Sequence, residues 1–366
     1  MKVIILKEQF LKSTSLVGQA VSIRPNLPVL GNFLLKTSPG ALEITATNLE
    51  TTISEKIPVK TDEAGETTVP ARLLIDLCQV AVGEKISLET EKDNLIVKVG
   101  AACANLSTIA PSEFPTPAPF VEEGGLVLER KVWQELVSAV AFCASPEGGR
   151  PVLSGILLQA TGSTLNLVAT DGYRLAKKEM KLKGSLLAII PARTLSDANK
   201  ALEVQEDETV EIGVNKDKNQ LRLQTKDLTI TTRLLEGDYP NYEQIIPTSF
   251  VTELRCSTKE LADAIKLASL FAREVGNVVR LETEDKTIKV SAITAQVGEA
   301  ETRLPATFTD EKIKIAFNSR FLLEALAAFK SKEIVFSFSG ATSAALLRGT
   351  EDPSLVYLVM PVRIQS

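Results

Sequence analysis

The chain has 366 residues, of which 44% are hydrophobic and 24% are charged, as in ordinary globular proteins, and its formal net charge is −5. It contains no histidine, which excludes Ser-His and Cys-His nucleophile pairs and histidine-ligated metal sites. The acidic balance argues against binding of polyanions over the whole surface, but it leaves room for a local basic face.

The first third of the chain alternates short strands with two helices. Apolar residues recur at helical spacing over residues 7–21. A Pro-Ala-Arg signal at 70–72 precedes a second helix at 73–80, because proline suits the first turn of a helix. The strands predicted here cover residues 2–6, 24–35, 41–46, 54–59, 85–89, 95–99 and 103–109.

The remaining two thirds repeat this plan. Helices are predicted at 131–143 and 194–202, and then at 257–273 and 321–329. The strands predicted between them cover residues 209–214, 220–224, 228–234, 278–282, 287–293, 334–339, 344–348 and 356–361. The proline- and glycine-rich segment 115–125 is expected to be a semi-rigid linker, and a shorter junction is expected at 247–251.

An internal repeat explains the recurring plan. Residues 28–50 align without gaps with residues 151–173, and an Arg-Pro pair stands at the start of each copy. A fainter copy covers residues 278–294. A period of about 120 residues predicts three copies of one unit. We therefore expect an α+β protein with domains at 1–121, 125–248 and 249–366, each with two helices among short strands.

The cysteines and the N-terminus bear on the compartment. Cys78, Cys103, Cys143 and Cys256 lack metal-ligand spacing and lie in apolar periodic segments, which predicts reduced, buried thiols. The N-terminal apolar run is too short for a signal peptide, and no run approaches the roughly 20 residues of a membrane-spanning helix. We expect a cytoplasmic protein without a metal or another cofactor.

Five stretches carry a resemblance to a known family. They are RPNLPVLGNFLL (24–35), TTVPARLLIDLC (67–78), VATDGYRLA (168–176), GDYPNYEQIIP (237–247) and YLVMPVR (357–363). In order and spacing they resemble the bacterial DNA polymerase III β subunit family, the sliding clamps. The resemblance implies three clamp-type domains, each with two helices packed on antiparallel sheets. It also implies a head-to-tail dimeric ring with helices inside and a continuous sheet outside.

The same resemblance implies a function and a set of partners. The ring would encircle duplex DNA, independently of sequence, and act as a non-catalytic processivity factor that tethers the replicative polymerase. The implied partners are the DNA polymerase III α subunit, the clamp loader δ subunit, and other polymerases and repair proteins that carry a short clamp-binding motif.

Basic residues at equivalent repeat positions are the predicted DNA contacts. Lysine and arginine attract phosphates without reading bases, as sliding requires. Three of the arginines open the second helix of a repeat, where a helix N-terminus also favours phosphate. The alternative is that each is an ordinary solvated side chain. The predicted residues are Arg24, Arg72, Arg150, Arg193, Lys12, Lys200 and Arg320.

A partner-peptide pocket between the second and third repeats is implied by the resemblance. Aliphatic and methionine side chains would line an adaptable groove, and Arg174 and Arg363 would donate to peptide carbonyls. The residues are Leu153, Thr170, Gly172, Tyr173, Arg174, Leu175, Pro240, Ile245, Thr342, Ala344, Leu358, Val359, Met360, Pro361, Val362 and Arg363.

The apolar members of this set have a second interpretation, because Leu153, Leu175 and Leu358 also fit a protein core. Two positions depart from the family pattern and bear on peptide preference: Tyr173 stands where many relatives carry histidine, and Gln244 where a basic residue is frequent. Residues 171–175 have no counterpart in the other copies, which favours one partner site per chain.

The dimer contact implied by the family joins the first repeat of one chain to the third repeat of the other. Leu270 and Phe271 would form an apolar plug. The acidic side chains of Glu299 and Glu301 would face Lys98. The edge at residues 99–104 carries no arginine, so few ion pairs are expected. The residues are Lys98, Ala104, Leu106, Leu270, Phe271, Glu299 and Glu301.

Two other classes of function remain in view. One is an enzyme with a carboxylate site around Asp171 or Asp238, although Asp171-Gly172 is typical of a turn and no paired-carboxylate or glycine-rich phosphate motif is visible. The other is a three-repeat, β-rich scaffold that binds peptides without encircling DNA.

Overall fold

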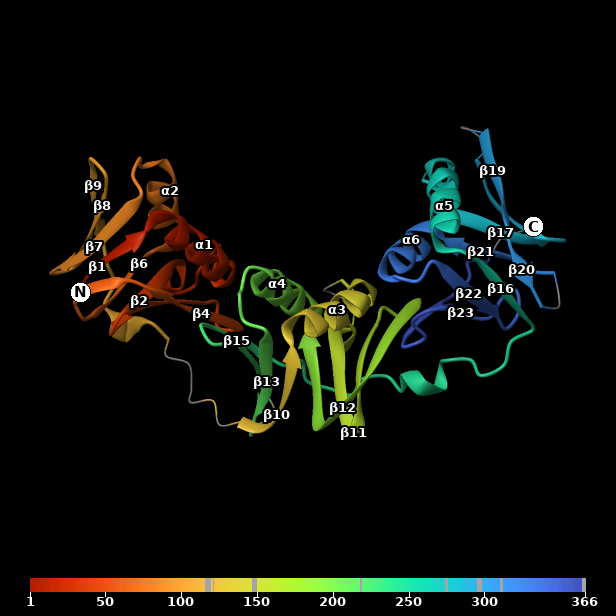
Figure 1. The fold of residues 1–366 in the computed structure, drawn as a ribbon, viewed down its shortest axis with the longest axis horizontal. Helices are drawn as coiled ribbons and strands as arrows, with labels where there is room; N and C mark the ends of the chain where they lie inside the picture. Colours follow the sequence, from red (N-terminus) through yellow and green to blue (C-terminus); the bar gives the residue numbers. More distant parts are fainter. Residues whose placement is uncertain are drawn as a thin grey trace. The chain divides into compact units, whose positions relative to one another are not determined.

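A computed structural model describes residues 1–115, 120, 122–146, 150–217, 219–273, 276–294, 298–309 and 312–363. Its internal contacts divide the chain into two compact units. Figure 1 draws the chain as a ribbon coloured along the sequence. Unit 1 comprises Met1–Trp133 and Asp197–Leu234, and unit 2 comprises Gln134–Ser196 and Leu235–Ser366. The division cuts through the central repeat, because strands of that repeat pair with the first repeat in unit 1 and with the third repeat in unit 2. Within the predicted linker, residues 116–119 and 121 lie outside the described residues.

A strand that leads directly into a helix recurs along the chain. Each repeat contains two such helices, as predicted. Most helix bounds agree closely with the sequence prediction, while residues Gly18–Ala20 and Ala141–Cys143 form short 3-10 turns after the first and third helices. The α-helices of the described residues are α1 (Lys7–Val17), α2 (Ala71–Val80), α3 (Arg130–Val140), α4 (Ala192–Glu203), α5 (Thr258–Ala272) and α6 (Ser319–Ala328).

Unit 1 contains two antiparallel sheets. The five-stranded sheet has the order β5 (Lys60–Glu63), β1 (Lys2–Leu6), β7 (Lys85–Glu91), β8 (Asn94–Val99) and β9 (Ala102–Ser107). The eight-stranded sheet has the order β10 (Glu122–Glu129), β13 (Thr209–Asn215), β14 (Gln220–Gln224), β15 (Leu228–Arg233), β4 (Thr51–Pro58), β3 (Ala41–Thr47), β2 (Asn32–Ser38) and β6 (Glu66–Pro70). Pairing of β15 with β4 makes one sheet from strands of the first and second repeats.

Unit 2 repeats this arrangement with strands of the second and third repeats. Its seven-stranded sheet has the order β11 (Gly155–Thr170), β12 (Arg174–Pro191), β24 (Leu355–Val359), β23 (Ala345–Gly349), β22 (Glu333–Phe338), β16 (Thr252–Ser257) and β20 (Thr307–Phe308). Its four-stranded sheet has the order β19 (Gly298–Pro305), β18 (Thr287–Thr294), β17 (Val278–Glu284) and β21 (Lys314–Asn318). The pair β12·β24 joins the two repeats.

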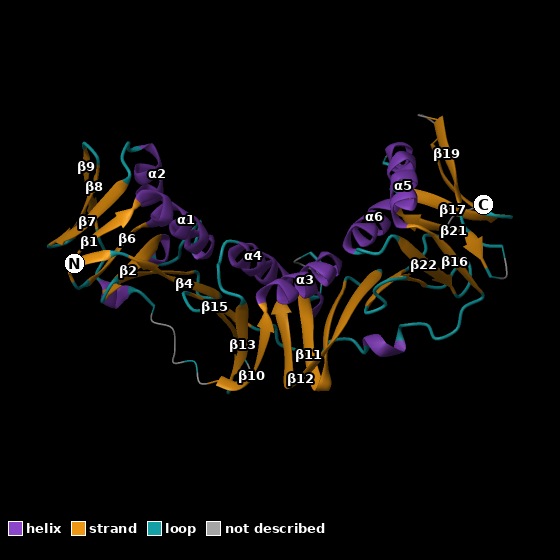
Figure 2. Ribbon diagram, in the orientation of Figure 1, coloured by secondary structure: helices purple, strands orange, loops and turns teal. Residues whose placement is uncertain are grey.

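Alternating burial along the strands explains how the sheets and helices pack. Every second side chain of β17 and of β18 is buried, so one face of the sheet supplies the core. In Figure 2, α5 and α6 lie beside each other against the strands of unit 2. Phe317 and Leu322 are completely buried there. None of the described helices is long and apolar enough to cross a membrane.

Two expectations need correction. The strand predicted at 24–35 begins only at Asn32, because Pro28–Gly31 form a 3-10 turn. The second copy behaves alike, with a 3-10 turn at Pro151–Ser154 before β11. Proline lacks the N–H that a sheet ladder needs, so pairing starts beyond it. Cys103 is exposed on β9, not buried as predicted.

The other thiols fit the expectation, since Cys78, Cys143 and Cys256 are buried and free. Burial raises the pKa of Cys78 to about 11 and that of Cys256 to about 12, so neither is a reactive thiolate at neutral pH.

Candidate functional site

The turn between β11 and β12 is built by its own side chains. Asp171 Oδ1 accepts hydrogen bonds from the backbone N–H groups of Tyr173 (2.9 Å) and Arg174 (3.0 Å). Thr170 Oγ1 donates to the Arg174 carbonyl (2.6 Å) and accepts from the Gly172 N–H (3.1 Å). Gly172 has a φ of 89°, which favours glycine. Asp171-Gly172 therefore forms a turn, as predicted, and the Asp171 carboxylate is used to hold it.

Arg174 lies beneath this turn and is only 7% exposed. Its Nε donates to Asp171 Oδ2 (3.0 Å), its Nη2 to the Phe142 carbonyl (2.7 Å) and its Nη1 to Glu324 Oε2. The guanidinium also stacks 4.3 Å from the ring centroid of Phe321. The expectation that Arg174 donates to peptide carbonyls is wrong for this structure, because its donors are taken by groups of the chain itself.

Glu324 holds a second arginine. Its Oε1 accepts from Arg320 Nε at 2.7 Å, one helical turn away on α6. Burial alone would raise the pKa of Glu324, but the hydrogen bonds from Arg320 and Arg174 outweigh burial and hold the pKa below its ordinary value. Burial alone would lower the pKa of Arg174, but the hydrogen bond to Glu324 and the charge interactions with its neighbours together raise the pKa above its ordinary value. Glu324 and Arg174 are therefore both charged at neutral pH.

An apolar cluster lies next to the turn, and every residue in it belongs to unit 2. Its buried members come from β11, β12, β23, β24 and the segment before β16. They are Leu157, Val168, Leu175, Ile189, Tyr242, Leu346 and Leu358. Half-buried residues pack against them, namely Val152, Leu235, Tyr239, Ile246, Phe250, Ala344 and Val356.

Three predicted pocket residues follow the second interpretation of the sequence. Leu153, Leu175 and Leu358 are 4%, 2% and 3% exposed, and Leu175 pairs with Leu358 in the β12·β24 register. These leucines are core side chains in this structure. Thr170 and Val359 are buried as well, so this group forms the base of the candidate site and not its accessible surface.

Other predicted residues form an accessible rim. Tyr173 is 67% exposed, Ile245 47% and Met360 41%. The Met360 N–H donates to the Tyr173 carbonyl at 2.8 Å, which ties the residues after β24 to the turn. Gly172, Thr342 and Arg363 are exposed, and Pro240, Ala344, Pro361 and Val362 are half-buried. All the predicted pocket residues thus lie within unit 2, some of them buried and the others half-buried or exposed.

Sequence reasoning missed several residues of this region. Phe142, Phe321 and Glu324 surround Arg174 but lie far from it along the chain. Tyr242 lies in the GDYPNYEQIIP stretch, and its hydroxyl donates to Gln159 Oε1 at 2.9 Å. The only local signal for Glu324 was its spacing from Arg320, because residues four apart lie on the same face of a helix and can pair.

The predicted DNA contacts are all exposed. Arg72, Arg193 and Arg320 are each the second residue of a helix, as the Pro-Ala-Arg signal and its counterpart indicate. Unit 1 carries Lys12, Arg24, Arg72 and Lys200, whereas unit 2 carries Arg150, Arg193 and Arg320.

Two of these side chains are paired with a carboxylate, since Lys200 bonds Asp197 (3.3 Å) and Arg320 bonds Glu324 (2.7 Å). Within the described parts of the chain, no ion pair engages the remaining five, Lys12, Arg24, Arg72, Arg150 and Arg193. Their charges are available to an external anion.

The residues predicted for a dimer contact lie on β8 and the edge strand β9 in unit 1, and on α5 and the edge strand β19 in unit 2. Over the described residues, β9 pairs only with β8, and β19 pairs only with β18. Leu270 is 52% exposed on α5, whereas Leu106 on β9 is 6% exposed and belongs to the core. The carboxylate of Glu301 already bonds Arg303 of its own chain, while Lys98 and Glu299 form no ion pair among the described residues. Ala104 is half-buried.

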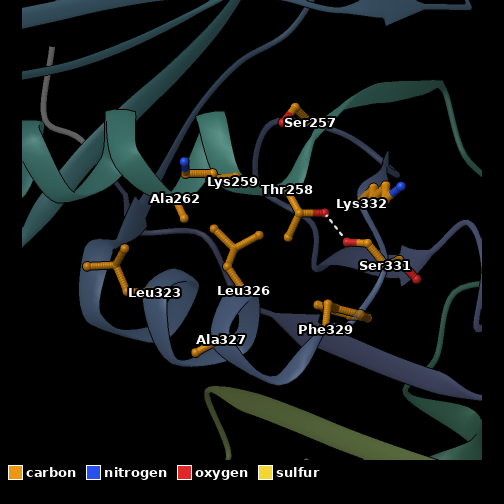
Figure 3. Close-up of a pocket in the computed structure, with 10 residues that line it drawn as sticks. All are labelled: Ser257, Thr258, Lys259, Ala262, Leu323, Leu326, Ala327, Phe329, Ser331 and Lys332. Atoms are coloured by element: carbon orange, nitrogen blue, oxygen red, sulfur yellow. Dashed lines mark hydrogen bonds between the residues drawn. The ribbon is translucent and has the colours of Figure 1, made fainter.

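A separate hollow of about 580 Å³ lies between α5 and α6 (Figure 3). Leu323, Leu326 and Phe329 supply its apolar wall, and the Thr258 hydroxyl donates to the Ser331 carbonyl at 2.7 Å. None of the predicted site residues lines it. It is therefore distinct from the rim around Tyr173 and Met360.

Comparisons with known proteins cover the whole chain. Three family models of the DNA polymerase III beta subunit match, the N-terminal domain at residues 1–118, the central domain at 127–241 and the C-terminal domain at 243–363. The beta sliding clamp of Salmonella typhimurium is 30% identical over 370 residues, covering 100% of both chains.

Solved structures agree with these matches. The DNA polymerase sliding clamp of Bacillus subtilis is 28% identical, with a TM-score of 0.94 and 100% coverage of both chains. A Pseudomonas aeruginosa sliding clamp bound to griselimycin gives the same identity, TM-score and coverage. The predicted three-domain fold of helices on antiparallel sheets is confirmed.

Proposed function

The chain belongs to the DNA polymerase III beta subunit family, and from this premise we infer that it is a DNA sliding clamp. Two chains form a ring that encircles duplex DNA and tethers the replicative polymerase. The observation that carries this function is the full-length match in sequence and fold to sliding clamps, at a TM-score of 0.94.

The ring holds DNA by topology and by weak phosphate contacts. The charges of Arg24, Arg72, Arg150 and Arg193, with Lys12, have no ion-pair partner among the described residues, and they supply sequence-independent attraction. Lys200 and Arg320 contribute after exchanging their carboxylate partners for phosphate. A topological tether requires no bond to be made or broken, so the chain is a non-catalytic subunit.

Partners dock on the rim around Tyr173, Ile245 and Met360. These side chains are large, apolar and exposed, and the buried cluster below them gives a firm base. Exposed apolar side chains grouped in this way are typical of a protein-binding surface. The partners are the DNA polymerase III α subunit, the clamp loader δ subunit, and other polymerases and repair proteins that carry a short hydrophobic clamp-binding motif.

The homodimer forms head to tail through free sheet edges. Strand β9 of one chain lies beside β19 of the other, with Leu270 and Phe271 packed at the contact and with Lys98 and Ala104 opposite Glu299 and Glu301. Unpaired strand edges favour such pairing. Each chain consists of domains 1–121, 125–248 and 249–366, and the ring acts in the cytoplasm.

The ring is tested by sliding. The protein is loaded on nicked circular DNA with a clamp loader, and the DNA is then cut once. We expect the protein to stay on the circle and to leave the linear product, because a closed ring runs off a free end. Retention on linear DNA would contradict encirclement. A chain that binds partners but is never retained on the circle would support the scaffold function instead.

The rim is tested separately with griselimycin, the ligand of the Pseudomonas aeruginosa clamp structure. In calorimetry, we expect the double variant Tyr173→Ala, Met360→Ala to bind griselimycin more than tenfold more weakly. The reason is that loss of a central anchor side chain typically costs about 2 kcal/mol or more of binding free energy. Leu187→Ala is the control, because Leu187 is 64% exposed on β12 outside the rim. An equal effect of both variants would mean that the site is misplaced.

A further inference from the structure

We propose that Glu324 couples the DNA-contacting surface to the partner-binding turn. Its carboxylate is shared by Arg320, a predicted DNA contact, and Arg174, which supports the Thr170–Arg174 turn. The affinity of the rim for a partner then depends on whether Arg320 is bound to a DNA phosphate. This inference rests on the proposed function of both surfaces.

The two arginines differ in their access to solvent. The Arg320 side chain is 74% exposed, while that of Arg174 is 7% exposed. An exposed i,i+4 pair is weak, so a DNA phosphate can replace Glu324 as the partner of Arg320. Arg174 cannot make this exchange, because its charge is buried and requires the carboxylates of Asp171 and Glu324.

A continuous set of bonds leads from Glu324 to the rim. Arg174 bonds both Glu324 and Asp171, and Asp171 Oδ1 accepts from the Tyr173 N–H at 2.9 Å. The Tyr173 carbonyl accepts from the Met360 N–H at 2.8 Å. Tyr173 and Met360 are the exposed side chains that a partner would meet. A change in how Glu324 holds Arg174 therefore acts on the backbone of the rim.

The direction of the coupling follows from charge. In the free protein two cations share one carboxylate, and they repel each other across it. When phosphate takes Arg320, the whole carboxylate is left to Arg174, and the turn is held more firmly. A turn that is already ordered loses less entropy when a partner binds. DNA binding should therefore strengthen partner binding, and by linkage a bound partner should strengthen DNA contact by the same factor.

Arg320→Gln imitates the phosphate-bound state, because it removes the competing cation without DNA. We expect this variant to bind fluorescein-labelled griselimycin about twofold tighter than the natural chain in fluorescence polarisation, the factor that an exposed pair of this kind implies. The natural chain should gain about the same factor when loaded on nicked circular DNA. Arg320→Gln should show no further gain on DNA.

The matched control is Arg255→Gln. Arg255 is an exposed arginine of unit 2 that bonds Glu333, and neither residue contacts the turn. This variant should keep the affinity of the natural chain and its response to DNA. Glu324→Gln should bind griselimycin more weakly, by about tenfold, and lose the response. A purely structural role for this helix would make Arg320→Gln and Glu324→Gln both weaken binding, so opposite signs identify coupling.

Equal affinities of Arg320→Gln and Arg255→Gln would overturn the coupling, as would a natural chain that gains nothing on DNA while still binding griselimycin. If the natural chain does not bind griselimycin at all, the proposed rim itself fails and the coupling fails with it. If the loaded protein does not leave linearised DNA, the proposed ring fails, whatever the polarisation data show.

Discussion

Arg174 shows what a residue's identity can and cannot indicate. An arginine is usually found at the surface, so the sequence suggests an exposed donor. The structure buries it and pairs it with Glu324, which lies 150 residues further along the chain. No local pattern predicts that pairing. The neighbouring Asp171-Gly172 turn was predictable, because its hydrogen bonds join residues only two or three apart.

The shared carboxylate predicts a pH dependence of stability. The pKa of Glu324 is lowered in the folded chain from its ordinary 4.5. A lowered pKa contributes stability above the unfolded value, and this stability is lost as the pH falls through the folded value. Glu324→Gln should therefore lower the free energy of unfolding by about 2 kcal/mol at pH 7.

This difference between Glu324→Gln and the natural chain should shrink as the pH falls below about 4.5, the unfolded pKa. Urea unfolding at a series of pH values measures it, with Glu333→Gln as the control for an exposed acidic partner of an arginine. A difference that stays constant down to pH 3 would contradict the assigned pairing.

At the scale of elements, helices were easier to predict than strands. Helical spacing and the Pro-Ala-Arg signal gave α2 and α4 almost completely. Strand β12 was missed because residues 177–183, KKEMKLK, look like a solvated charged segment. In the structure they extend the β11·β12 hairpin, seen side by side in Figure 1, with alternate side chains exposed. The pattern of charged residues in a segment does not indicate how far along the chain a β-hairpin extends.

The free edges of β9 and β19 make the dimer contact testable through α5. Leu270 is an exposed leucine, and Leu270→Asp would bury a charge in an apolar contact. We expect this variant to elute as a monomer in size-exclusion chromatography with light scattering, while the natural chain elutes as a dimer. Leu187→Asp, at another exposed leucine, should remain dimeric. Dimers of both variants would exclude Leu270 from the interface.

Cys103 reports on the same edge independently. Its thiol is exposed on β9, whereas Cys78, Cys143 and Cys256 are buried. In the Leu270→Asp monomer we expect a single thiol to react rapidly with a disulfide reagent under native conditions, and Cys103→Ser to abolish this reaction. In the natural dimer the same thiol should react more slowly, because β19 of the other chain covers it. Equal rates in monomer and dimer would place the contact elsewhere.

At the scale of the whole molecule, the period of the sequence predicted three repeats and their helix pairs. It did not predict which strands join one repeat to the next. The pairs β4·β15 and β12·β24 depend on which sheet edges remain free after each repeat has folded, and every strand has two candidate neighbours. Nor could composition place the charges, since a net charge of −5 coexists with exposed arginines at equivalent repeat positions.

Those arginines lead to a prediction that separates local contact from net charge. The variant Arg24→Gln, Arg72→Gln, Arg150→Gln and Arg193→Gln removes four exposed cations with no carboxylate partner among the described residues. Its control, Lys36→Gln, Lys60→Gln, Arg255→Gln and Lys312→Gln, removes four exposed cations that are paired with Glu66, Asp62, Glu333 and Asp285. Both variants lose the same charge.

Duplex binding is then followed by fluorescence anisotropy over a range of salt concentrations. Each phosphate contact contributes about 0.9 to the slope of log affinity against log salt, and the ring carries these cations on both chains, so the first variant should lose a slope of up to about seven. The control should keep most of the natural slope, because its cations already have partners and lie outside the predicted contacts. An equal loss of slope in both variants would mean that the chain binds DNA only through its overall charge. That result would contradict the assigned contacts.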